Sequence, residues 1–85
     1  MSYYVYVLKS EHHKKSYVGH TDNLARRLKE HNSGIVKSTK SFRPYNIIYI
    51  EKYNTEHDAR NREKYFKYWK GRKEKKNILR SCGIV

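Results

Sequence analysis

The chain has 85 residues, of which 20 are Lys or Arg and 8 are Asp or Glu, so its formal net charge is +12. This length predicts one domain over residues 1–85 with a thin core, since such a chain buries only about 60% of its unfolded surface. An aromatic content of 14% is too high for a disordered tail. The sequence holds no apolar run of the ~20 residues that span a bilayer, no signal-peptide pattern and one cysteine, which excludes an intrachain disulfide. We therefore expect a small cytoplasmic domain with no membrane contact.

The positive charge is concentrated in two segments. Residues 60–80 hold ten Lys or Arg and two Glu, a net charge of +8, and residues 33–44 hold three basic residues and no acid. A solubilising surface would explain an ordinary Lys-rich chain. This density of charge, interleaved with aromatic residues, instead favours contact with a nucleic acid. The side chains expected to bind it are Lys37, Lys40, Arg43, Arg62, Lys67, Lys70, Arg72 and Lys73.

The N-terminal part predicts a β-hairpin. Residues 3–9 are β-branched and aromatic, and their apolar side chains on both faces indicate either a central strand or one whose face lines a site. A polar stretch and a short strand over residues 16–20 follow. A four-residue loop would place Tyr6 opposite Tyr17. Any even loop puts the two tyrosines on one face of the sheet, and an odd loop separates them.

A first helix is predicted after this hairpin. Thr21 is the expected N-cap, with Asp22 in the first turn, and the Asn-Ser-Gly sequence of residues 32–34 is the expected end. Arg27 and His31 lie four residues apart, beside the buried stripe of this helix. Basic side chains in that position are not typical of residues that only contact solvent.

The C-terminal half predicts a third strand over residues 45–53 and a second helix over residues 56–70. A capping box at Thr55 opens that helix and Gly71 interrupts it, with a further short helix over residues 73–80. The order β-β-α-β-α is typical of a small α+β domain.

Glu63 is the only carboxylate between residues 60 and 73 and lies at the edge of the inner face of the second helix. A carboxylate among cations suits a hard metal ligand or the anchor of a phosphate site. An ion pair with Lys67, one turn further on, explains its position equally well. Arg62 falls in the middle of the apolar arc, a position that the sequence does not explain. The histidines lack the spacing of a zinc site, and no glycine-rich phosphate loop is present.

Taken together, these residues resemble the GIY-YIG nuclease family. The two motifs correspond to residues 4–6 (YVY) and 17–19 (YVG), and the stretch YVGHTDNLARRLKEHNSG is the most specific part of the match. The resemblance extends over residues 3–79. It is closest to small standalone members related to the N-terminal nuclease module of the excinuclease C subunit. Tyr4 replaces the glycine of the first motif, and valine replaces isoleucine in both motifs.

The resemblance implies a three-stranded antiparallel sheet flanked by helices, and an endonuclease that hydrolyses phosphodiester bonds in DNA. It also implies one divalent metal ion, Mg²⁺ or Mn²⁺, held by Glu63, and a phosphate bound by Arg27. Selection for DNA structure and a role in repair or recombination are further expectations. The implied catalytic residues are Tyr6, Tyr17, Arg27, His31 and Glu63.

Two other functions are alternatives to the enzyme. In the first, the chain is a nucleic-acid-binding module with little turnover whose specificity comes from a partner protein, and phosphate contacts and stacking along residues 60–76 carry the function. The second, a protein–protein adaptor, explains neither the charge nor the site. The presence of both tyrosines with Arg27 and Glu63 favours the enzyme, because binding alone does not need that set.

Overall fold

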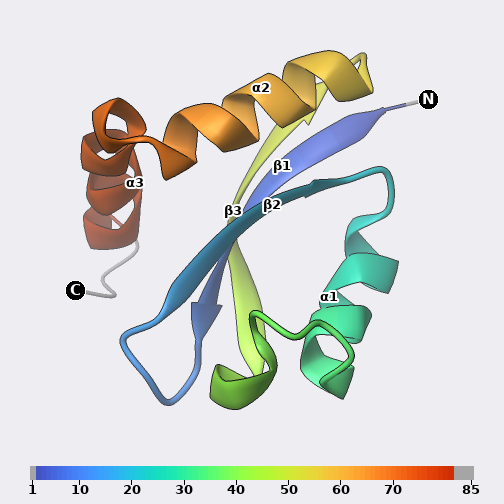
Figure 1. Cartoon of the computed structure of the whole chain (residues 1–85), viewed down its shortest axis with the longest axis vertical. Coiled ribbons are helices and arrows are strands. Elements are labelled where there is room, and N and C mark those ends of the chain that lie inside the picture. The colour runs from blue at the N-terminus through green and yellow to red at the C-terminus, as the bar shows by residue number, and fades with distance from the viewer. Residues whose placement is uncertain (1, 82–85) are drawn as a thin grey trace.

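The computed structural model describes residues 2–81, without the side chains of Trp69 and Lys70 (Figure 1). Its elements are β1 (Tyr3–Ser10), β2 (Ser16–Thr21), α1 (Leu24–Ser33), the 3₁₀ helix η1 (Lys40–Phe42), β3 (Tyr45–Tyr53), α2 (Glu56–Lys67) and α3 (Trp69–Ser81). The strands form one antiparallel sheet in the order β2-β1-β3. This confirms the predicted α+β class and the central position of the first strand. Within residues 2–81, none of the helices is long and apolar enough to cross a membrane.

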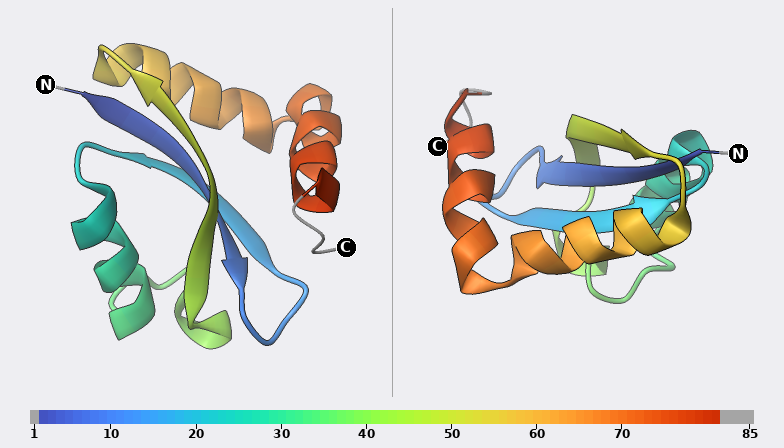
Figure 2. Two further views of the ribbon diagram at one scale, coloured as in Figure 1. Left: turned by 180° about the vertical axis from the view of Figure 1, so that it is seen from behind. Right: turned by 90° about the horizontal axis from the view of Figure 1, so that it is seen from above.

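The central strand β1 is buried on both faces and contributes to two cores. The core on the α2 side consists of Val5, Val7, Val18, Ala59 and Phe66. The core on the α1 side consists of Tyr6, Leu8 and Tyr45, with Phe42 of η1 packed against it. Because side chains alternate along a strand, β1 gives its odd-numbered residues to one core and its even-numbered residues to the other. Figure 2 shows α2 running along the sheet and α3 set at a steep angle to the end of α2. Ile78 and Leu79 of α3 pack against the core on the α2 side.

The register of the hairpin between β1 and β2 fixes where Tyr6 and Tyr17 lie. Ser16 pairs with Lys9, so the loop holds six residues rather than four, and Tyr6 lies opposite Gly19. The pairing of Tyr6 with Tyr17 that a four-residue loop would give is therefore absent. Since six is also even, the two tyrosines do share a face of the sheet, as predicted.

Helix α1 begins later than predicted and ends where predicted. Its N-cap is Asn23, whose side chain accepts a hydrogen bond from Arg26 N at 3.0 Å. Thr21 remains in β2, where its hydroxyl accepts from Asn23 N at 3.1 Å, so its prediction as the cap is wrong. At the other end, Gly34 adopts φ 87°, which favours glycine, and its N–H bonds to the His31 carbonyl.

The predicted second helix is divided into two. α2 begins after its Thr55 cap as predicted, but it ends at Lys67, and the break falls at Tyr68 rather than at Gly71. Gly71 lies inside α3, where an added Cβ would overlap the carbonyl of Tyr65. The glycine is therefore needed for the close approach of α3 to the end of α2, and it does not interrupt a helix.

Arg62 connects α2 to β3 and α3 through a polar network. Its Nε and Nη2 donate to the two carboxylate oxygens of Glu51 at 2.8 and 3.0 Å, and Nη2 also donates to Glu74 at 2.7 Å. The hydroxyls of Tyr49 and Tyr53 donate to the same Glu51 carboxylate. Although burial opposes its ionisation, these hydrogen bonds lower the pKa of Glu51 to about 2. This network explains why Arg62 lies in the apolar arc, and it leaves little of its charge for the nucleic-acid contact that the sequence suggested.

The network predicts a difference in stability between two arginines of α2. Arg62→Met should lower the free energy of unfolding by about 3 kcal/mol, because it leaves the Glu51 carboxylate largely buried without its cation. Arg60 forms an exposed ion pair with Glu56 at 3.1 Å, so Arg60→Met should lower it by less than about 1 kcal/mol. Urea unfolding of both variants gives the comparison. Equal losses would contradict a structural role specific to Arg62.

Candidate active site

The candidate site lies along the edge strand β2, between α1 on one face of the sheet and α2 on the other. Its side chains come from four elements and are Tyr6, Tyr17, His20, Arg27, His31, Glu63 and Lys67. Tyr17 and Gly19 of β2 face α1, whereas Val18 and His20 face α2. All five residues that the sequence predicts as catalytic belong to this cluster, although their positions in the chain are far apart.

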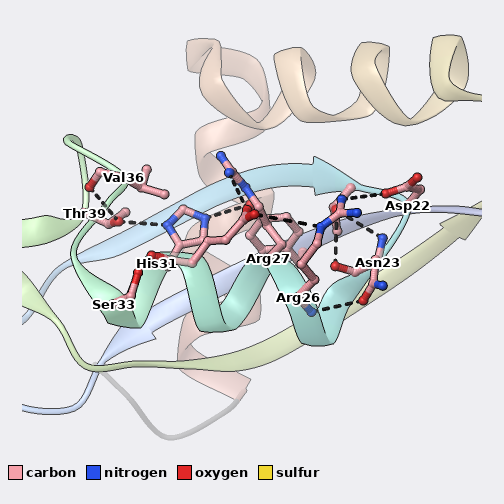
Figure 3. Close-up of polar contacts among 11 residues, drawn as sticks. Asp22, Asn23, Arg26, Arg27, His31, Ser33, Val36 and Thr39 are labelled. Atoms are coloured by element: carbon pink, nitrogen blue, oxygen red, sulfur yellow. Dashed lines mark hydrogen bonds and ion pairs between the residues drawn. The ribbon is translucent and has the colours of Figure 1, made fainter.

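Tyr6 and His31 form the buried part of the site. The Tyr6 side chain is 2% exposed, and its hydroxyl lies 2.9 Å from Nε2 of His31. On the other side of the imidazole, Nδ1 lies 2.8 Å from the hydroxyl of Thr39 (Figure 3). Burial, together with the charge of Arg27, lowers the pKa of His31 to about 4. The imidazole is therefore neutral at pH 7.

Arg27 connects this buried pair to the surface. Its guanidinium bonds to the Tyr6 hydroxyl and donates from Nη1 to Glu30 at 3.0 Å. Burial raises the pKa of Tyr6 to about 12, even though the hydrogen bond and the charge of Arg27 act in the opposite direction. Tyr6 is therefore a protonated phenol at pH 7 and can act as a hydrogen-bond donor.

Tyr17 is the more accessible of the two tyrosines. Its ring centroid lies 6.5 Å from that of Tyr6 and 5.0 Å from that of His31, and Nζ of Lys67 lies 5.2 Å above its ring. No described side chain forms a hydrogen bond with its hydroxyl, which leaves this group available to a ligand. The motif glycine also has a steric role, because a Cβ at Gly19 would lie 2.6 Å from Cζ of Tyr6.

Glu63 is held by two nitrogen donors. Nδ1 of His20 lies 2.6 Å from its Oε1, and Nζ of Lys67 lies 2.9 Å from its Oε2. Burial opposes ionisation, but the hydrogen bonds from Lys67 and His20 hold the pKa of the Glu63 carboxyl below its usual value. The ion pair with Lys67 that the sequence predicted as an alternative is therefore present. It does not exclude a role as a ligand, since each carboxylate oxygen can accept more than one partner.

His20 is the site residue that sequence reasoning missed. Its signal lies in the strand alternation, since His20 follows the YVG motif directly and so points to the face opposite Tyr17 and Gly19. Glu63 lies on the inner edge of the helix that covers that face. Both features are local, but their combination depends on how α2 crosses the sheet.

An open pocket of about 310 Å³ adjoins the site at Arg27 and His20. It lies where β2 ends, beside the first turns of α1 and α2. Its lining residues are Tyr3, His20, Thr21, Asp22, Arg26, Arg27, Glu30 and Glu56. The pocket thus places Arg27 and His20, which bonds to Glu63, on one open surface that a phosphate group can reach. Tyr4, which replaces the glycine of the first motif, is not part of this lining.

The predicted nucleic-acid contacts fall into two groups rather than one patch. Lys37, Lys40 and Arg43 are exposed in the segment between α1 and β3, and Arg72 and Lys73 are exposed on α3. Figure 1 shows these two segments on different sides of the sheet. The Lys70 side chain lies outside the described part of the chain.

Lys67 belongs to a cationic junction between the site and α3. Burial, together with the charges of Arg72 and Lys67, lowers the pKa of Lys75. These three side chains are therefore close enough to repel one another. A bound phosphate would relieve that repulsion.

Glu63 has the chemistry that a hard divalent ion requires. Mg²⁺ binds through one or two carboxylates and retains several water molecules. The Glu63 side chain is ionised and 17% exposed, so it fits this role as a single carboxylate ligand. Within residues 2–81, no group of three or more His, Cys, Asp or Glu side chains could enclose a metal ion.

A sequence model described as the GIY-YIG catalytic domain matches residues 2–77. The chain belongs to the GIY-YIG family. Among its relatives are a UPF0213 protein of Pediococcus pentosaceus, 39% identical over 96% of this chain and 85% of the relative, and the UPF0213 protein CPE1444 of Clostridium perfringens, 38% identical over 75% and 69%. The solution structure of the UPF0213 protein BH0048 from Bacillus halodurans superposes with a TM-score of 0.57. It is 27% identical and covers 98% of this chain and 88% of that one. These matches confirm the resemblance that the sequence motifs indicated.

The buried imidazole of this GIY-YIG site predicts a specific pH dependence. The unfolded chain binds a proton on His31 near pH 6.5, but the folded protein binds it only near pH 4. The free energy of unfolding should therefore be highest above pH 6.5 and fall by about 3 kcal/mol as the pH drops towards 4. NMR titration of the His31 ring measures the folded pKa directly, and His31→Asn should remove this part of the pH dependence. Arg27→Gln should raise the pKa of His31 without restoring 6.5, because the ring stays buried. A titration of His31 near 6.5 in the intact protein would overturn this description.

Proposed function

We propose that this GIY-YIG protein is a divalent-metal-dependent endonuclease that hydrolyses phosphodiester bonds in DNA, and that it acts in the cytoplasm. The family is one of nucleases, which supports the reaction class. The observation that carries the proposal is that one connected set of contacts at the edge of β2 joins Tyr6, Tyr17, Arg27, His31 and Glu63.

Arg27 is suited to bind the phosphate that is attacked. Its guanidinium lines the open pocket and is oriented by Glu30 at 3.0 Å and by the Tyr6 hydroxyl. A planar guanidinium presents two parallel donors to phosphate oxygens, which a lysine in this position would not do. Arg27 therefore fixes the phosphate beside both tyrosines.

The two tyrosines have different roles in this proposal. Tyr17 offers an accessible hydroxyl that orients the attacking water. Tyr6 is protonated and bonded to a neutral imidazole, so it can accept a proton from the water only while it passes its own proton to His31. Binding of a phosphate to Arg27 offsets the charge that helps to lower the pKa of His31, which makes the imidazole a better base in the complex.

Glu63 would hold the divalent ion, which when bound stabilises negative charge on the phosphate and on the leaving oxygen. His20 and Lys67 orient the carboxylate towards β2. Lys67 is also part of the cationic junction with Arg72 and Lys75, along which the DNA backbone would continue. A preference for branched or flapped DNA, and a role in repair or recombination, are further parts of this proposal.

Removal of the Glu63 carboxylate tests the mechanism. Glu63→Ala should abolish Mg²⁺- or Mn²⁺-dependent cleavage, a loss of at least about 100-fold, and largely preserve DNA binding. Labelled duplex, single-stranded, flap and branched DNA are incubated with Mg²⁺, Mn²⁺ or EDTA, and calorimetry measures Mn²⁺ binding to both proteins. Glu11→Ala, which removes a carboxylate from the β1–β2 loop, is the matched control and should cut at the normal rate.

Undiminished cleavage by Glu63→Ala would exclude this mechanism. Salt-sensitive binding by the unaltered protein with no cleavage of any substrate would instead support a nucleic-acid-binding module whose specificity comes from a partner protein.

A further inference from the structure

The proton of the Tyr6 hydroxyl has one acceptor among the described side chains. Two side-chain groups contact this hydroxyl, the Arg27 guanidinium and Nε2 of His31. A guanidinium has only donors, so the Tyr6 proton must point to Nε2. Nε2 therefore carries a lone pair rather than a hydrogen, and a neutral imidazole must then carry its hydrogen on Nδ1.

The contacts of Thr39 lead independently to the same assignment. Its hydroxyl lies 2.8 Å from Nδ1 of His31 and donates its own hydrogen to the carbonyl of Val36 at 3.4 Å. With that hydrogen used, the Thr39 oxygen acts as the acceptor of an Nδ1–H. Hydrogen bonds donated in one direction, from Tyr6 to His31 to Thr39 to Val36, thus satisfy all of these groups. Among the described residues, no buried side-chain nitrogen or oxygen lacks a hydrogen-bond partner, which agrees with this arrangement.

The burial of Thr39 differs from that of its neighbours. Its side chain is 1% exposed, whereas the flanking residues Ser38 and Lys40 are exposed in the same basic segment. Val36 fixes the backbone at this point, since its carbonyl also accepts from the backbone N–H groups of Thr39 and Lys40 at 3.2 and 3.0 Å. The hydroxyl is therefore held in one position against the imidazole.

We propose that Thr39 is a positioning residue for the nuclease reaction: its hydroxyl holds His31 in the Nδ1–H tautomer, so that Nε2 receives the Tyr6 proton during hydrolysis. The proton leaves the Tyr6 oxygen and bonds to Nε2, and the imidazole becomes an imidazolium whose Nδ1–H remains bonded to Thr39. The kinetic part of this proposal rests on the proposed function. The tautomer part does not.

The test compares Thr39→Val, which removes the hydroxyl at nearly constant shape, with Thr39→Ser, which retains it. Long-range ¹H–¹⁵N NMR spectra identify which imidazole nitrogen is protonated. We expect Nδ1–H in the unaltered protein and in Thr39→Ser, and a shift towards Nε2–H in Thr39→Val. The kcat for DNA cleavage should fall about 10- to 100-fold in Thr39→Val with KM little changed, and Thr39→Ser should restore most of it. Ser38→Ala, from the adjacent exposed position, should change neither measurement.

Three results would overturn the proposal. They are an Nε2–H tautomer in the unaltered protein, a tautomer that is unchanged in Thr39→Val, and a tautomer that changes while kcat does not. The first needs no variant, so it is decisive even if Thr39→Val does not fold. If the unaltered protein cuts no DNA, the proposed function fails and the kinetic part fails with it, and the NMR spectra still decide the hydrogen-bond assignment.

Discussion

The burial of β1 on both faces is the constraint on which the site depends. A strand between two helical layers must contribute apolar side chains to each, and Tyr6 also carries a polar group into the core. A buried hydroxyl needs partners, because leaving it unsatisfied costs about 1–3 kcal/mol. Those partners are His31 and Arg27, both from α1, so the same contacts that satisfy the core also assemble the reactive cluster.

The edge strand β2 divides the site into a neutral half and a charged half. On the α1 side, burial holds Tyr6 as a phenol and His31 as a neutral imidazole. Neither group is charged in the resting state. On the α2 side, Lys67 and His20 hold Glu63 as a carboxylate. The two halves meet at β2, where the ring of Tyr17 lies beneath the Lys67 ammonium. In the proposed reaction, this separation would allow proton transfer and charge stabilisation to occur side by side, because each group keeps the protonation state that its own environment favours.

The basic residues show how the same side-chain type serves different purposes in a highly cationic chain. Arg62 is bound by Glu51 and Glu74 inside the fold and stabilises the packing of α2. Lys67 is shared between Glu63 and the Tyr17 ring, whereas Arg72 remains exposed on α3. A net charge of +12 indicates a polyanionic partner, but only the distribution of partners over the surface decides which cations are available to it.

Local patterns in the sequence determined the three strands, the end of α1, the start of α2 and the identity of the motif residues. These features depend on alternation, caps and a glycine at φ 87°, which neighbouring residues encode. The hairpin register, the break at Tyr68 and the partners of the site residues were decided by the tertiary structure. His20 and Glu63 are 43 residues apart, and Tyr6 and His31 are 25 apart, so no periodicity links them. They meet because burying both faces of β1 brings α1 and α2 to the same edge strand, and that packing is a property of the whole chain rather than of any segment.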